Sequence, residues 1–285
     1  MSLQLNLIVI VLFAAVTNAL WNTIVKISGD RFLTATAVLG SGTVFGIFFL
    51  PLVPVPTPVM CLFLTASVTI HAVYHLCLIN AYRFGDLTQV LSPSKGKRAA
   101  MSCVAGRVVT VGEVPNAWAM AGIVMVSVGI VSLSFNHRLG AEHQGRTVLL
   151  ALATGFLISA YTVVDGLGIR LSNDLWSYIV WLMVLEGVPF LIWTALWRRH
   201  TVAPFLKREW KRALAGGILS KLAYGCILYA LAQGAMVHVS ALRETSVLFA
   251  AVIGTLMLKE HFGVRRILAS AVIAIGIIVM QMAEI

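Results

Sequence analysis

The sequence predicts an all-α, polytopic membrane protein of ten transmembrane helices, arranged as two inverted five-helix repeats. Three observations carry this prediction. Hydrophobic residues fill 59% of the 285 positions, charged residues fill 11%, and the mean hydropathy is +0.93, whereas soluble domains contain about 25% charged residues. Ten apolar segments have the ~20 residues that a helix needs to cross a bilayer. Short motifs also recur in the two halves of the chain.

Each apolar segment is expected to be a helix, because an open strand would leave backbone polar groups unsatisfied in lipid. The first half has predicted spans at 5–25, 32–53, 59–81, 87–112 and 116–135. The second half has predicted spans at 147–169, 175–197, 213–232, 238–258 and 264–282. The first span lacks a basic leading region and a small-residue cleavage site, so we expect a retained helix and not a removed signal peptide.

The segments between the spans are rich in proline or in charge. Prolines at 51, 54, 56 and 58 predict a stiff turn after the second span, which contains the motif Gly42-x-x-x-Gly46 that allows close helix approach. The polar stretch 136–146 is a candidate linker, and we place the first repeat at 1–137 and the second at 138–285. A basic loop is expected at 198–212.

Motifs that return at a nearly constant shift indicate the repeat. The Ala-x-x-x-Gly motif that begins at Ala81 returns at Ala230, a shift of 149 residues, and Glu113 returns as Glu260, a shift of 147. Because each half has an odd number of spans, the second half must enter the membrane inverted. Inverted repeats are typical of transporters, whose substrate site lies near the midplane between the halves.

Loop charges predict an orientation. Fourteen lysines and arginines follow odd-numbered spans, and only Arg170 lies on the opposite side. If the fourth span crosses, the excess of positive charge places the odd-numbered loops in the cytoplasm and both termini outside. The net charge of +10 is thus explained by loop positions, and no basic face with interleaved aromatic residues indicates a nucleic-acid partner.

Several of these motifs resemble those of the EamA-type transporters of the drug/metabolite transporter superfamily. The matching pieces are Trp21-Asn22-x-x-x-Lys26, Ala81-Tyr82-x-x-Gly85-Asp86-Leu87-x-Gln89-Val90, Ala241-Leu242-Arg243-Glu244-Thr245, Gly112-Glu113 and Lys259-Glu260. The resemblance covers nearly the whole chain. It implies ten helices in an inverted-repeat basket with a central cavity, and export or exchange of small metabolites, amino acids among them.

One segment departs from the family pattern, which continues from Gln-Val into Tyr-Pro-x-x-Arg-Gly and an apolar run. This chain reads Leu91-Ser92-Pro93-Ser94-Lys95-Gly96-Lys97-Arg98, and Arg107 follows. A charge at the centre of a spanning helix costs ~2.5–3.5 kcal/mol. Two interpretations stay open. These cations line a polar cavity, with Lys95-Gly96 in place of the Arg-Gly pair, or a local reading-frame error altered residues 91–109.

Polar and ionisable side chains inside the apolar spans are the candidate site residues, because in lipid they usually face a partner or a wet cavity. The substrate-binding candidates are Asn18, Trp21, Asn22, His71, Tyr74, His75, Lys95, Tyr161, Lys221, Tyr224, Arg243 and Thr245. The proton-coupling candidates are Glu244 and Asp165. No catalytic motif, cofactor motif or third metal ligand occurs at the required spacing, so we expect no enzyme activity, no cofactor and no metal.

The candidates in the first half also have structural interpretations. His71 and His75 are four residues apart on one helix face; they bind a substrate carboxylate or relay protons, or they are simply a hydrogen-bonded interior pair. Trp21 is more typical of an interface anchor than of a lid over a substrate.

The charged candidates in the second half have the same two interpretations. Lys221 binds an anionic group, or it forms a structural salt bridge with Glu244 or Asp165. Glu244 is the best single candidate for a proton carrier, because burial disfavours its charged form while Arg243 favours it. Alternatively, Glu244 and Arg243 form an ion pair without a role in transport. Asp165, near the end of its span, either couples protons or reaches the membrane surface.

The expected function is secondary transport of a small polar metabolite, such as an amino acid or an organic acid, by alternating access between the repeats. The partners would be that substrate, membrane lipid and possible coupling protons, and the location a bacterial inner membrane. The alternative is a non-transporting membrane subunit or a lipid-head-group-binding protein, in which the buried charges pair off in a closed bundle. An intramembrane enzyme would need a converging acid/base pair, which the spacing does not show.

Overall fold

The computed structural model describes residues 5–81, 141–172, 174–234 and 236–243 as continuous segments. It also describes the positions 118, 121–122, 124–125, 245–246, 248–250, 252–253, 268, 271–273, 275–276 and 279. The described residues form helices and no strand, which confirms the all-α prediction for this part of the chain. The predicted fourth span lies outside the described residues, and the predicted fifth and tenth spans lie mostly outside them.

The first half contributes three long helices and a proline-rich turn. The elements are α1 (Leu5–Ile27), α2 (Arg31–Ile47), the short 3-10 helix η1 (Leu50–Leu52) and α3 (Pro58–Ala81). Asp30 caps α2, because its carboxylate accepts a hydrogen bond from the Leu33 amide at 3.0 Å. The turn after η1 is fixed to a later helix, since the carbonyl of Pro54 accepts hydrogen bonds from Ser177 and Trp181, each at 3.0 Å.

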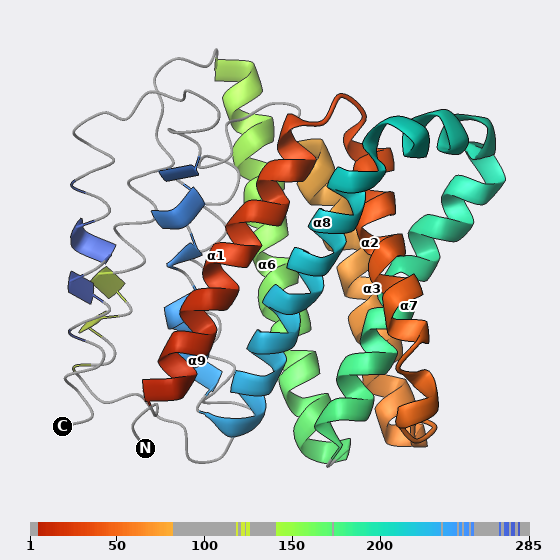
Figure 1. Cartoon of the computed structure of the whole chain (residues 1–285). Helices are drawn as coiled ribbons and strands as arrows, with labels where there is room; N and C mark the ends of the chain where they lie inside the picture. The colour runs from red at the N-terminus through yellow and green to blue at the C-terminus, as the bar shows by residue number, and fades with distance from the viewer. Residues whose placement is uncertain are drawn as a thin grey trace.

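The second half contributes four described helices. They are α6 (Ala141–Ser172), α7 (Leu175–Trp197), α8 (Arg199–Gln233) and α9 (Met236–Arg243). Asp174 caps α7 by accepting a hydrogen bond from the Ser177 amide at 3.0 Å. The predicted basic loop at 198–212 is wrong: α8 begins at Arg199, and its first turns, drawn in teal, lie across the top of the bundle before the helix descends (Figure 1).

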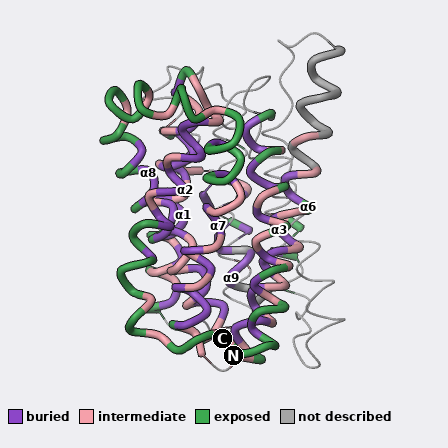
Figure 2. The backbone as a smooth tube through the Cα atoms, turned by 90° about the vertical axis from the view of Figure 1, so that its right-hand side faces the viewer, coloured by how far each residue is buried: buried purple, intermediate pink, exposed green. Residues whose placement is uncertain are grey.

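Four described helices are long and apolar enough to cross a membrane, namely α1, residues 58–80 of α3, α7 and α8. Large apolar side chains are exposed on them, including Phe13 (50%), Leu62 (68%) and Ile192 (54%). Figure 2 shows buried positions inside the bundle and exposed positions along its outer surface. Such extensive exposed apolar surface is not tolerated in water, so these outer faces contact lipid.

The helices pack in pairs that join the two halves of the chain. The most extensive contacts are those of α3 with α6, of α1 with α8, and of α2 with both α7 and α8. Figure 1 shows these helices as an upright bundle. Aromatic side chains from several helices, among them Trp21, Tyr74, Tyr161 and Phe190, meet in one buried cluster, and this cluster surrounds the candidate site described below.

Glycines bring α2 very close to its neighbours, as the Gly42-x-x-x-Gly46 motif predicts. A Cβ atom on Gly46 would lie 3.0 Å from a side-chain carbon of Val184 in α7. A Cβ atom on Gly217 in α8 would lie 2.8 Å from the backbone carbonyl oxygen of Val38 in α2. A side chain can often rotate away from such a contact, whereas a helical backbone cannot, so the Gly217 contact is the stricter of the two.

The substitution Gly217→Ala is therefore expected to lower the free energy of unfolding by about 1–3 kcal/mol, the usual cost of overpacking. Gly225→Ala is the matched control on the same helix, because a Cβ atom there would meet no atom within 4 Å. Alanine favours a helix over glycine by roughly 0.5–1 kcal/mol, so the control should be neutral or stabilising. Thermal unfolding of both variants in detergent checks this, and equal effects of the two substitutions would contradict the close approach of α2 and α8.

Candidate functional site

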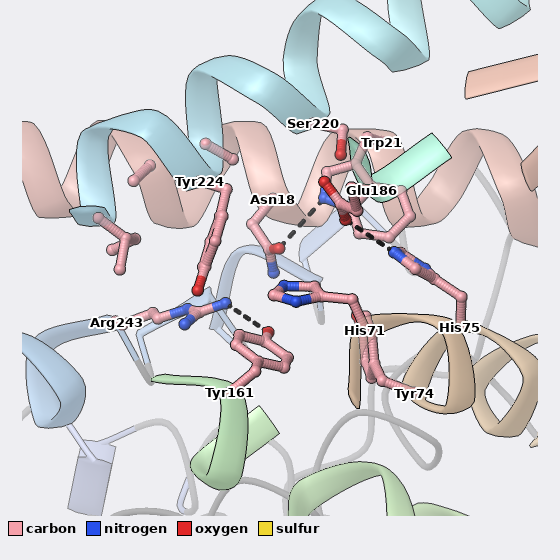
Figure 3. A pocket seen from close by; sticks show the side chains of 13 residues that line it. Asn18, Trp21, His71, Tyr74, His75, Tyr161, Glu186, Ser220, Tyr224 and Arg243 are labelled. Carbon is pink, nitrogen blue, oxygen red and sulfur yellow. Dashed lines mark hydrogen bonds and ion pairs between the residues drawn. The ribbon is translucent and has the colours of Figure 1, made fainter. Parts of the chain in front are cut away.

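A small cavity lies at the centre of the described bundle, with a volume of about 30 Å³. Side chains from α1, α3, α6, α7, α8 and α9 line it, so both halves of the chain contribute (Figure 3). The lining residues are Ala14, Asn18, Trp21, His71, Tyr74, His75, Tyr161, Glu186, Ser220, Ala223, Tyr224, Ile227 and Arg243. Eight of them are predicted substrate-binding residues: Asn18, Trp21, His71, Tyr74, His75, Tyr161, Tyr224 and Arg243.

A buried charge cluster forms one end of the cavity. Glu186 of α7 accepts a hydrogen bond from the Nε2 atom of His75 at 3.0 Å and forms an ion pair with Lys221 of α8. All three residues are buried, with 7% of Glu186, 6% of Lys221 and 3% of His75 exposed. A buried carboxylate is stable only when it is paired and hydrogen-bonded. This carboxylate binds both partners, one through each oxygen.

A glycine makes room for the lysine of this cluster. The aliphatic part of the Lys221 side chain runs directly against Gly42 of α2, where a Cβ atom would lie 2.9 Å from Cγ and 3.0 Å from Cδ of the lysine. The ion pair with Glu186 holds the other end of the same side chain. A side chain at position 42 would therefore displace the lysine stem from this path.

The Arg243 guanidinium group forms the opposite end of the cavity (Figure 3). It donates hydrogen bonds to the hydroxyl groups of Tyr161 at 3.0 Å and of Thr162 at 3.4 Å. Its central carbon lies 5.8 Å from the ring centroid of Tyr161 and 5.4 Å from that of Tyr224, which is within the range of a cation–π interaction. Hydroxyl and aromatic groups thus hold a buried cation at the cavity wall.

The two histidines lie between these ends and are both buried. The His71 ring stacks on Tyr161, with ring centroids 3.9 Å apart and an interplanar angle of 24°. Its Nδ1 atom donates a hydrogen bond to the backbone carbonyl of Ser67 at 2.9 Å, which leaves Nε2 as the acceptor in the neutral ring. His71 and His75 therefore have hydrogen-bond partners within the protein and also line the cavity.

Asp165 lies one layer behind the cavity wall and does not reach the membrane surface. It is fully buried. The hydroxyl group of Tyr178 donates a hydrogen bond to its carboxylate at 2.7 Å, and the hydroxyl group of Tyr224 donates to the other oxygen. Because Tyr224 also lines the cavity, it connects Asp165 to the site.

The first helix brings a tryptophan and two amides to the site. Trp21 is only 5% exposed, so the interpretation as an interface anchor is wrong. Its indole nitrogen donates a hydrogen bond to the Asn18 side chain at 3.1 Å, and both residues line the cavity. Asn22 is buried, and its side-chain amide donates a hydrogen bond to the backbone carbonyl of Asn18 at 2.7 Å. Asn22 does not line the cavity.

The remaining candidates fall into two groups. Lys221, Asp165 and Thr245 are buried but do not line the cavity. The Thr245 hydroxyl group donates a hydrogen bond to the Leu242 carbonyl at 2.8 Å. Lys95 and Glu244 lie outside the described residues, so their predicted roles stay predictions.

The sequence interpretation missed Glu186, which is the described partner of Lys221. Glu186 takes the place of Asp165 as that partner, because its carboxylate lies against the lysine while Asp165 accepts hydrogen bonds from Tyr178 and Tyr224. Glu244, the other alternative, lies outside the described residues. The signal was present in the sequence. Glu186 is the one charged residue in the apolar helix Leu175–Trp197, and an acidic residue inside a spanning segment indicates a functional or paired position.

The cavity is small in comparison with a metabolite. A volume of about 30 Å³ holds roughly two water molecules, since one water needs at least ~10–15 Å³. An amino acid or a comparable organic acid needs several times this space. The space between these lining residues is therefore too small for a ligand of that size.

Comparisons with known proteins indicate the class of this chain. Residues 145–282 match the model of the EamA-like transporter family, which confirms the resemblance inferred from the motifs for this half of the chain. No match was found among curated proteins. A solved structure described only as a crystal structure of a protein aligns over 97% of this chain and 97% of its own chain, with a TM-score of 0.75 and 16% sequence identity. That likeness shows a shared fold alone.

Proposed function

We propose that this chain, whose second half matches the EamA-like transporter family, is a secondary transporter of a small polar metabolite such as an amino acid or an organic acid. The family match indicates a membrane transporter of the drug/metabolite transporter superfamily. The substrate class and the mechanism are our proposals, and they rest on the chemistry of the central cavity.

One observation carries the substrate class: a cation and a carboxylate lie at opposite ends of the same buried cavity. Arg243 is at one end and Glu186 at the other, with His71 and Asn18 between them (Figure 3). A guanidinium group binds a carboxylate through a planar pair of donors. A zwitterion would place its carboxylate on Arg243 and its ammonium group near Glu186, whereas an organic acid would need only the first contact.

The pattern of helix packing supports a two-fold relation between the halves. In a five-plus-five repeat, α1 corresponds to α6 and α3 corresponds to α8. The contact of α3 with α6 then corresponds to the contact of α1 with α8, and these are two of the most extensive contacts in the described bundle. Alternating access in such a protein is a rocking of one half against the other around a fixed site.

Proton coupling is proposed for two carboxyl groups. Asp165 is buried and is connected to the cavity through the hydroxyl group of Tyr224. Glu244 follows directly after Arg243 in the sequence. Protonation of either carboxyl group would change the net charge near Arg243, the cation that we propose binds the substrate carboxylate. A change of this kind can bias a two-state carrier.

Counterflow in proteoliposomes tests the proposal. The full-length protein is reconstituted with an amino acid or organic acid inside the vesicles, and uptake of the labelled compound is measured with and without a pH gradient. We expect saturable exchange of at least one carboxylate-bearing compound, and we expect Asp165→Asn to lower the effect of the pH gradient more than the exchange itself. Protein-free vesicles are the control, and no exchange across a broad panel would overturn the transport function.

A second candidate function is a non-transporting membrane subunit. The observation that favours it is that the buried charges in the described residues have protein partners, with Glu186 bonded to Lys221 and His75, and Asp165 bonded to two tyrosines. A closed bundle of this kind would show no exchange. Its melting temperature would also be the same with and without high concentrations of the panel compounds, because a ligand stabilises the state that binds it.

A further inference from the structure

A large apolar groove lies on the outer surface of the bundle and shares no lining residue with the central cavity. Its volume is about 640 Å³, and it is bounded by α2, α7 and the first half of α8. Its lining side chains include Leu191, Leu206 and Trp210, which are 37%, 40% and 52% exposed. The groove is therefore open to the surroundings of the protein.

The groove offers apolar surface but little hydrogen-bonding capacity. The hydroxyl group of Ser41 donates to the Val38 carbonyl at 2.9 Å, and the hydroxyl group of Thr194 donates to that of Thr36 at 3.4 Å. These polar groups of the lining are thus already bonded inside the protein. A peptide or a sugar would lose hydrogen bonds with water on entering such a groove, whereas a hydrocarbon chain would not.

The first part of α8 is amphipathic, with its apolar face on this groove. Val202, Leu206, Trp210 and Ala213 follow one another at intervals of three or four residues and all line the groove. The other face of the same turns carries exposed basic residues. The exposed basic residues are Lys207, Arg208, Lys211 and Arg212. This part of α8 lies across one end of the bundle (Figure 1).

We propose that this groove is a binding site for an anionic phospholipid. One acyl chain fills the groove between α2 and α7, and the phosphate group lies against the basic face of α8. Arg199, which is exposed and lines the groove, joins the two parts of the site. Trp210 lies where the apolar face meets the basic one, and tryptophan is favoured at the level of lipid headgroups. Clustered basic residues at a membrane surface attract anionic lipid.

The charge of the helix decides which lipid is bound. An apolar groove alone would accept any acyl chain, so it would not distinguish between headgroups. Each Lys or Arg near an anionic surface contributes about fivefold in affinity, and the helix presents several of them. The site should therefore prefer phosphatidylglycerol to phosphatidylcholine with the same acyl chains.

Native mass spectrometry of the full-length protein tests this site. Delipidated protein in detergent is mixed with palmitoyl-oleoyl phosphatidylglycerol or with palmitoyl-oleoyl phosphatidylcholine, and the bound lipid is counted at each concentration. We expect one lipid to be retained with about tenfold or higher preference for phosphatidylglycerol. The triple variant Lys207→Gln/Arg208→Gln/Lys211→Gln should lose this preference and bind both lipids weakly.

A groove-filling variant separates the proposed site from general charge attraction. Ala195→Phe adds an aromatic ring at a lining position, and Ala215→Phe adds the same ring at an exposed position of α8 that does not line the groove. Ala195→Phe should lower retention of both lipids about fivefold or more, while Ala215→Phe should bind as the unchanged protein does. Equal retention of the two lipids by the unchanged protein would overturn the proposal, as would full retention of phosphatidylglycerol by Ala195→Phe.

Discussion

Replacing Glu186 by glutamine is expected to lower the free energy of unfolding by about 3–5 kcal/mol, the usual effect of removing one partner from a buried ion pair. The substitution leaves Lys221 as a buried cation without its carboxylate and leaves only an uncharged amide oxygen to accept the His75 hydrogen bond. Unfolding of the purified protein in mixed detergent micelles measures this loss.

Two further variants identify its cause. Glu209→Gln is the matched control, because Glu209 pairs with Arg212 on the surface, where 57% of the arginine side chain is exposed; such pairs contribute about 0–1 kcal/mol. The double variant Glu186→Gln/Lys221→Met should recover much of the stability, since no buried charge is then left unpaired. If the double variant is as unstable as Glu186→Gln with the lysine retained, the ion pair is not the source of the effect.

Replacing Arg243 by lysine is expected to raise the half-saturating concentration of a carboxylate substrate about a hundredfold, even though the charge is kept. Loss of one hydrogen-bonded partner of a buried charge costs ~2–5 kcal/mol, and ~1.4 kcal/mol is tenfold. Lysine lacks the planar donors of arginine and packs less well on the rings of Tyr161 and Tyr224. Counterflow in proteoliposomes measures the change.

The matching surface substitution, Arg212→Lys, should leave transport unchanged, because the described partner of Arg212 is Glu209 on the same helix, outside the cavity lining. Tyr161→Phe keeps the aromatic ring but removes the hydroxyl group that accepts from Arg243, so it should have an intermediate effect. Melting temperatures of all variants separate lost folding from lost binding. Unchanged half-saturation in Arg243→Lys would exclude Arg243 as the carboxylate site.

Helix positions could be predicted from the sequence where one physical signal dominated. The span 175–197 coincides with α7, because a mostly apolar segment, in which Glu186 is the one charged residue, extends between an aspartate cap and an arginine pair. The basic stretch 198–212 was harder, since its many charges suggest a loop and Pro204 disfavours a helix interior. The three- and four-residue spacing from Val202 to Ala213 was the signal for the helix that forms there.

The candidate site could be predicted in composition but not in pairing. Mid-span polar residues such as His71, Tyr161 and Arg243 meet at one cavity, because each is costly in lipid and the bundle interior is the available alternative. Which acid pairs with Lys221 depends on how α7 and α8 are rotated about their own axes where they pack together. Hydropathy contains no information on the rotation of one helix relative to another. Glu186, like Lys221, is a charged residue inside an apolar span, and such residues are typically paired or functional. A search of every span for charged residues would therefore have identified it.

The contact between Gly42 and Lys221 has an evolutionary consequence. The two residues lie on different helices, yet the stem of the lysine occupies the space that any side chain at position 42 would need. We therefore expect substitutions at these two positions to be coupled: a methyl group at 42 displaces the lysine stem, and a displaced stem weakens the ion pair of Lys221 with Glu186.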